Sequence, residues 1–152
     1  MGLDMYLSKK TYVKRWDHMT ADELFTVSVK KGGKKYPSID YKRVSYVVEE
    51  VAYWRKANAI HKWFVDNVQD GKDDCGHYYV EKDKLKELLT AINAVLGDNT
   101  KAKELLPPQG GFFFGNTGID EYYVQDLQYT KETLEKLLAE GGEGDFEYRS
   151  SW

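Results

Sequence analysis

The residues best suited to chemistry in this chain follow one another at the spacing of a helix. Trp54, Asn58 and His61 stand at positions i, i+4 and i+7, and Arg55 and Lys62 flank the face that they would share. These groups would suit a nucleotide-like anion. The indole can stack on a base, the amide can hydrogen-bond to a base edge, and the imidazole and the two cations can contact the negative charge. In the alternative interpretation the tryptophan packs at the rim of the core and the two polar residues make local hydrogen bonds.

A second group of candidate residues lies in a glycine-rich loop. Phe112, Phe113 and Phe114 have glycines on both sides and precede a predicted helix, whose first amides could receive a phosphate. The loop lacks the Gly-Lys-Ser/Thr ending of a P-loop, and acidic residues already occupy the positive end of the helix dipole. We therefore expect the three rings to form an aromatic wall of the ligand pocket. The alternative is a buried phenylalanine cluster under a tight turn.

Two further patterns are weaker candidates for chemistry. Cys75 and His77 would lie on the same side of an extended strand, which suits a thiolate nucleophile or two metal ligands, although an inert cysteine beside a turn is the alternative. Asp70, Asp73 and Asp74 crowd one loop, but they do not match the EF-hand pattern and are typical of a solvated turn. We expect no bound metal and no cofactor, and we assign no catalytic residue.

Charge is distributed unevenly along the chain. Residues 1–62 hold 13 Lys and Arg against 7 Asp and Glu, whereas residues 63–152 hold 9 against 18. The run Lys30–Lys35 predicts either a basic hairpin tip or a solvated turn. A pI of about 5.7 argues against a partner that is duplex nucleic acid, so a small anionic molecule is the expected partner. The opposite charges of the two halves also favour a homo-oligomer.

Length and composition favour a single globular domain over residues 1–152. With 152 residues, 41% of them hydrophobic and only three prolines, the chain can bury one core. It has no run of about 20 apolar residues that would span a membrane. One cysteine excludes an intrachain disulfide and is typical of a reducing compartment.

The first half of the chain predicts two strands and a helix. Alternating residues indicate strands at residues 4–10 and 24–30, and residues 43–48 fit either a strand or the approach to a helix. From Glu49 onward the period becomes helical, with an end near Gly71. The apolar stripe of this predicted helix comprises Tyr53, Ala57, Ile60, Phe64 and Val68.

The second half of the chain predicts a short strand and two more helices. Residues 78–80 indicate the strand, and Gly97 ends the helix that follows it. Thr117 to Asp120 resembles a capping box at the start of the last helix, and residues 143–152 form either an edge strand or a frayed tail. The fold class is therefore α+β, a small domain with about three amphipathic helices on a short, mostly antiparallel sheet. The apolar sides of the two helices comprise Leu85, Leu88, Leu89, Ile92, Val95 and Leu96, and Tyr123, Leu127, Thr130, Leu134 and Leu138.

The whole chain resembles a family of small, largely uncharacterised proteins of tailed bacteriophages and prophages. Four segments carry the resemblance: the N-terminal MGLDMYL, residues 51–67 around YWRKAN, the DCG and YY of residues 74–79, and the GFFFG of residues 111–115 with the DEYY that follows. The resemblance implies a phage origin and a location in the host bacterial cytoplasm. It supplies no activity and no site residues, although small phage proteins often serve host takeover or counter-defence.

These observations lead to one functional expectation and two alternatives. We expect a protein that binds a nucleotide-derived ligand, plausibly a host immune signal, and sequesters it without turnover. The first alternative is an enzyme that hydrolyses such a ligand with His61 or His77 as general acid or base. The second is an inhibitor that uses exposed aromatic residues against a host enzyme.

Overall fold

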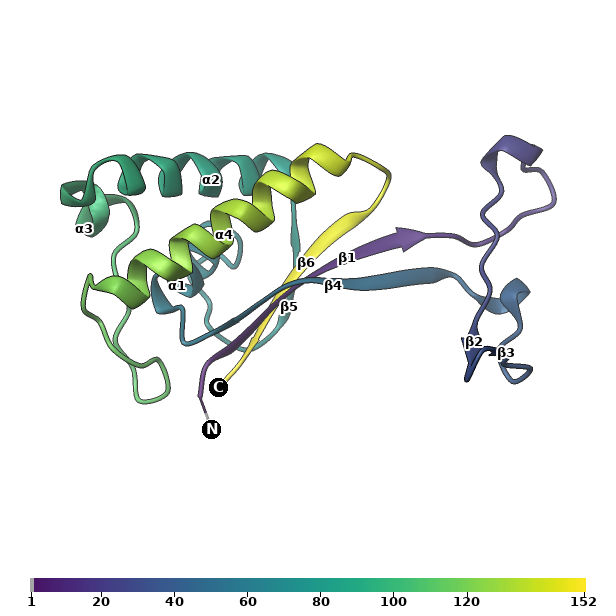
Figure 1. The fold of residues 1–152 in the computed structure, drawn as a ribbon, viewed down its shortest axis with the longest axis horizontal. Helices are drawn as coiled ribbons and strands as arrows, with labels where there is room; N and C mark the ends of the chain where they lie inside the picture. Colours follow the sequence, from purple (N-terminus) through teal and green to yellow (C-terminus); the bar gives the residue numbers. More distant parts are fainter. Residues whose placement is uncertain (1) are drawn as a thin grey trace.

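The chain forms one four-stranded antiparallel sheet with helices on a single face (Figure 1). The computed structural model describes residues 2–152, and the order of the strands in the sheet is β4-β1-β6-β5. A separate hairpin pairs β2 with β3. This architecture confirms the predicted α+β class. The strands are β1 (Asp4–Tyr12), β2 (Lys30–Lys31), β3 (Lys34–Lys35), β4 (Tyr46–Arg55), β5 (His77–Val80) and β6 (Asp145–Ser151).

Three amphipathic helices supply the layer that covers the sheet. They are α1 (Asn58–Asn67), α2 (Lys82–Gly97) and α4 (Glu121–Glu140), and a single turn, α3 (Ala102–Leu105), follows α2. Short 3₁₀ turns occur at Ala21–Glu23, Tyr41–Arg43 and Asn99–Lys101. No helix of residues 2–152 has the length and apolarity needed to cross a membrane.

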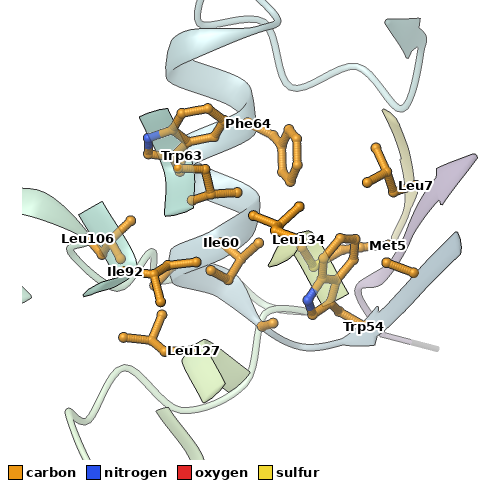
Figure 2. Packing of buried hydrophobic residues seen from close by; sticks show 14 of the residues in the cluster. Met5, Leu7, Trp54, Ile60, Trp63, Phe64, Ile92, Leu106, Leu127 and Leu134 are labelled. Atoms are coloured by element: carbon orange, nitrogen blue, oxygen red, sulfur yellow. The ribbon is translucent and has the colours of Figure 1, made fainter. Parts of the chain in front are cut away.

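The core lies between the helical layer and one face of the sheet. Met5 and Leu7 of β1 point toward the helices because alternate residues of a strand face opposite sides. Figure 2 shows them in the same cluster of buried side chains as Ile60 and Phe64 of α1, and all four residues are fully buried. The Phe64 ring stacks on Tyr148 of β6 at a centroid distance of 3.9 Å, which joins α1 directly to the sheet. The other sheet face, which carries Tyr53 and His77, has no helical cover.

The predicted helix at Glu49 is wrong over its first nine residues. Strand β4 continues to Arg55, and α1 begins only at Asn58. Tyr53 is therefore 42% exposed instead of buried, whereas Ala57, in the turn, is buried as expected. The physical reason is the pairing of residues 46–55 with β1 over its full length, which satisfies backbone groups that a helix would have satisfied locally.

Three other local predictions also need correction. Residues 24–29 form no strand, because only Lys30 and Lys31 find a partner, in the hairpin with β3. The capping box at Thr117 is wrong, because the Asp120 side chain itself accepts a hydrogen bond from the amide of Tyr123 and begins α4. The C-terminal segment is a strand, but an inner one, since β6 lies between β1 and β5.

The remaining helix predictions are confirmed. Helix α2 ends at Gly97, and its buried side chains include Leu85, Leu88 and Ile92, while Leu89 is partly buried. Four residues of the predicted stripe of α4 are buried in the core, but at its end Leu137 is buried and the predicted Leu138 is only partly buried.

The central position of Phe64 makes it the strongest single test of this core. We expect Phe64→Ala to lower the free energy of unfolding by about 3 to 5 kcal/mol, because it removes a stacked ring and leaves a cavity. Urea denaturation measures this change. Phe112→Ala is the matched control, because the ring of Phe112 is 95% exposed and its loss should change stability by less than about 0.5 kcal/mol. Similar losses for the two variants would contradict the core assignment.

Candidate functional site

A cavity of about 250 Å³ lies between the N-terminal ends of α1 and α4. We call it the α1–α4 cavity. The end of β4, the first turn of α1, residues 115–118 and the first two turns of α4 enclose it. Its wall combines basic, acidic, amide and aromatic groups, which is the mixture that binds and orients a small ligand. The polar and aromatic side chains that line it are Arg55, Lys56, Asn58, Asn116, Asp120, Tyr122, Tyr123 and Asp126.

One side of the cavity is electropositive. Arg55 ends β4 in an exposed position, and Lys56 follows in the left-handed conformation with φ of 56°. This turn sends the chain directly into α1, and no side chain of residues 2–152 caps that helix. Ala59 and Ile60 of the first turn line the cavity, where the positive end of the helix dipole adds to the two cations. These groups together favour an anion.

The opposite side of the cavity carries two carboxyl groups in different states. Asp120 is engaged as the cap of α4 and also accepts a hydrogen bond from Asn116 at 3.3 Å. Asp126 is half-buried, and burial, together with the charge of Asp120, raises its pKa to about 6. Neither an N–H nor an O–H donor of residues 2–152 contributes to this shift. Asp126 is therefore available to accept a hydrogen bond from a ligand or to exchange a proton with it.

Asn58 holds the wall of the cavity in place. Its side-chain nitrogen donates to the carbonyl oxygens of Phe114 and Asn116, both at 2.9 Å, and its oxygen accepts the amide of Gln109 at 3.0 Å. The carboxamide is only 5% exposed and is engaged at both ends. The Asn58 side chain therefore positions the loop of residues 109–116 against α1. It has no free polar atom with which to form a hydrogen bond to the edge of a base.

His61 is fully buried, and its ring contacts a network that runs from the core to the surface. Its Nδ1 lies 2.7 Å from the hydroxyl of Tyr148, and its Nε2 lies 3.0 Å from the carboxylate of Asp73. The other oxygen of Asp73 accepts a hydrogen bond from the indole of Trp152 at 3.0 Å. Burial raises the pKa of Tyr148 well above its usual value. The network joins α1 to β6 and to the loop before β5, and the imidazole has no exposed surface for a ligand.

The face predicted from Trp54, Asn58 and His61 does not form. Trp54 belongs to β4 and lies in the core, where its indole donates to the hydroxyl of Thr130 at 2.8 Å. Lys62 lies on α1 but pairs with Asp66 at 2.6 Å, and it does not line the cavity. Of the five residues first singled out, only Arg55 and Asn58 line the cavity.

The three phenylalanines of the loop divide between core and surface. Phe114 is buried, with its ring edge-on to His61 at 5.2 Å. Phe113 is half-buried beside Trp152, and Phe112 points into solvent. None of the three rings lines the α1–α4 cavity, so the expected aromatic wall is absent from it. Tyr122, which is 76% exposed, supplies an aromatic ring there instead.

The weaker candidates make structural contacts. Cys75 has a φ of 56° in the turn before β5 and is not part of the strand that holds His77. His77 lies 2.7 Å from Glu147 on the uncovered sheet face. Asp74 accepts hydrogen bonds from Tyr78 and from the amide of Gly76, and these bonds lower its pKa. No group of three or more potential metal ligands occurs within residues 2–152.

Sequence reasoning missed Lys56, Asn116, Tyr122 and Asp126. A signal for the last was present, because Asp126 is an acidic residue directly beside the apolar stripe of α4. The other three residues gave no signal, because they become neighbours only when α1 and α4 pack together.

Removing the Asn58 side chain tests its role in the loop. We expect Asn58→Ala to lower the free energy of unfolding by about 2 to 4 kcal/mol, because two buried carbonyl oxygens and one amide lose their partner. Asn67→Ala in the same helix is the control, since Asn67 makes a single hydrogen bond, to the carbonyl of Trp63. Hydrogen exchange should accelerate in residues 109–116 of the first variant only. An unchanged loop would refute the role assigned to Asn58.

The raised pKa of Asp126 predicts a pH-dependent stability. Because the folded chain holds the proton more tightly than the unfolded chain, stability should fall as the pH rises from about 4 to about 6 and level off above that. Asp126→Asn should remove this loss and stabilise the fold at pH 7, by less than about 2 kcal/mol because solvent still reaches the carboxyl. Denaturation at a series of pH values measures both profiles, and identical profiles would contradict the assignment. Glu135→Gln, at an exposed position, is the control.

The chain was compared with protein families, curated proteins and solved structures. No family model matches the sequence, and no curated protein and no solved structure matches the chain. The function of the α1–α4 cavity therefore has to follow from the geometry of its own residues.

Proposed function

We propose that the chain binds a small nucleotide-derived anion in the α1–α4 cavity and retains it without turnover. The observation that carries this proposal is the pairing of a basic side with a half-buried acid in one cavity. Arg55, Lys56 and the first turn of α1 would hold the phosphate. Asp126 on the opposite side would accept a hydrogen bond from an amino group or hydroxyl of the base or sugar.

The size and the aromatic content of the cavity narrow the class of ligand. A volume of about 250 Å³ is slightly below the range of about 300 to 1,000 Å³ that is usual for drug-sized ligands. A mononucleotide, or a smaller derivative with one base, suits this volume better than a ligand with two bases. The exposed ring of Tyr122 offers a surface on which one base can stack.

Sequestration agrees with the positions of the titratable groups. His61 is sealed in the core and His77 lies on the uncovered sheet face, so neither imidazole lines the cavity. Asp120 is engaged as a helix cap. In the phage context implied by the sequence resemblance, the ligand would be a nucleotide signal of the bacterial host, removed from its receptor in the host cytoplasm by an abundant binding protein.

Asp126 supports hydrolysis of the ligand as a second candidate function. A carboxyl with a pKa of about 6 can act as general acid or base near neutral pH. Incubation of the wild-type chain with each of the four ribonucleoside 5′-monophosphates, followed by chromatography, separates the two functions. Sequestration predicts recovery of the intact nucleotide. Product in molar excess over protein, lost in Asp126→Asn, would establish hydrolysis instead.

Substitution of Arg55 tests the site itself. We expect at least one of the four nucleotides to bind more tightly than inorganic phosphate in calorimetric titrations. Arg55→Ala should weaken binding of that nucleotide by about 1.5 to 3 kcal/mol, because a charge-assisted contact is lost. Lys62→Ala is the matched control, since it removes a neighbouring cation that pairs with Asp66 and does not line the cavity.

A second pair of variants tests the stacking surface. Tyr122→Ala should cost about 1 to 3 kcal/mol of binding free energy, and Tyr79→Ala on the uncovered sheet face should cost nothing measurable. The proposal would be contradicted if Arg55→Ala and Lys62→Ala, or Tyr122→Ala and Tyr79→Ala, weakened nucleotide binding equally. It would also be contradicted if none of the four nucleotides bound.

A further inference from the structure

Residues 13–45 form an arm that projects away from the helices. The arm connects β1 with β4 and contains the β2–β3 hairpin, and Figure 1 shows it beyond the ends of α2 and α4. It holds eight Lys and Arg against four Asp and Glu. The four lysines of the hairpin have no ion-pair partner within residues 2–152.

The arm lacks a core of its own. Val13, at its base, is the one buried residue among residues 13–45. Large apolar and aromatic side chains are exposed instead, a composition that is enriched in protein interfaces and depleted on free surfaces. These exposed side chains are Trp16, Phe25, Val29, Tyr36, Ile39 and Tyr41.

The total accessible surface is too large for a compact monomer. The chain exposes 9660 Å², whereas a monomer of 17.6 kDa is expected to expose roughly 7,900 Å². The excess of about 1,800 Å² per chain is larger than the roughly 800 Å² that each partner contributes to a standard interface, so the exposed arm has enough surface to form one.

The arm carries a groove suited to an acidic, partly apolar surface. A cavity of about 410 Å³ has Val29, Tyr36 and Ile39 among its lining side chains. Arg15, Lys30 and Lys35 also line it, so positive charge surrounds apolar contacts. Duplex nucleic acid has no comparable apolar surface to place in such a groove, which favours a protein partner.

The chain itself carries a complementary surface. Residues 131–145, which comprise the second half of α4, the turn after it and the first residue of β6, hold five Asp and Glu against two Lys. Glu132 and Glu135 are exposed on the second half of α4, and Tyr129 beside them is 42% exposed. This part of α4 lies beyond the residues that line the α1–α4 cavity.

We propose that the arm of each chain docks on the acidic segment 131–145 of a second copy, which includes the second half of α4, and that this gives a dimer with two reciprocal arm–helix contacts. Two-fold symmetry repeats the contact, so that the exposed arm of each copy is covered by the other copy. The proposal does not depend on nucleotide binding, because neither contact surface lines the α1–α4 cavity.

Sedimentation velocity and light scattering test the dimer. The wild-type chain should be dimeric at about 100 µM in 50 mM salt, and the dissociation constant should rise with salt because the contact is charged. Lys34→Glu/Lys35→Glu in the arm and Glu132→Lys/Glu135→Lys in α4 should each raise the dissociation constant at least about tenfold. Lys101→Glu/Lys103→Glu, which changes two exposed lysines outside both surfaces, should leave it unchanged. Circular dichroism verifies that every variant remains folded.

A mixture of the two reversed variants decides whether the partner is a second copy. The acidic arm of one variant then faces the basic helix of the other, and the remaining contact has its natural charges. A heterodimer should form with an affinity within about threefold of the wild type, although each variant alone associates weakly. A monomeric wild-type chain, a failure of the mixture to associate, or nucleic acid that co-purifies with the wild type but not with the arm variant would overturn the proposal.

Discussion

The side chain of Asn58 is the contact on which the candidate site depends. Strand β4 ends at Arg55 and turns through Lys56 in the left-handed conformation, so Asn58 begins α1 opposite the loop of residues 109–116. Three hydrogen bonds of its carboxamide hold that loop. Without them, residues 115–118 would have no fixed position beside the first turn of α1, and the α1–α4 cavity would lose one wall. A buried polar residue thus fixes geometry that apolar packing alone leaves open.

The contacts of His61 likewise fix the position of the C-terminal end of the chain. Its two ring nitrogens contact Tyr148 on β6 and Asp73 in the loop before β5, and Asp73 in turn binds Trp152. Both nitrogens are engaged, so the network satisfies the buried imidazole. Asn58 and His61 therefore have the polarity of binding residues but act as internal anchors. In the proposed site, Arg55, Lys56 and Asp126 would supply the contacts to the ligand.

The accuracy of sequence prediction depended on whether the decisive contacts were local. Helices α2 and α4 have long apolar stripes and were predicted well, because each helix satisfies its own backbone. The helix prediction was wrong for residues 49–57 because Tyr53 and Ala57 happen to fit a helical period, while the pairing of β4 with β1 joins residues 34 to 51 positions apart. The α1–α4 cavity was unpredictable for the same reason, since Lys56 and Asp126 are brought together only by the packing of α1 and α4. The basic hairpin was visible in sequence, but the lack of a core around it was not.

In the proposed function, an anionic nucleotide binds at the uncapped N-terminus of α1. A titration of the ¹⁵N-labelled chain with the tightest-binding of the four ribonucleoside monophosphates tests it residue by residue. Binding at this position should produce saturable shifts in the amide resonances of Ala59, Ile60 and Asn116, which line the cavity. The β2–β3 hairpin and the uncovered sheet face should remain unchanged. Shifts confined to the lysines of the hairpin, or no saturable shift in the first turn of α1, would contradict the claim.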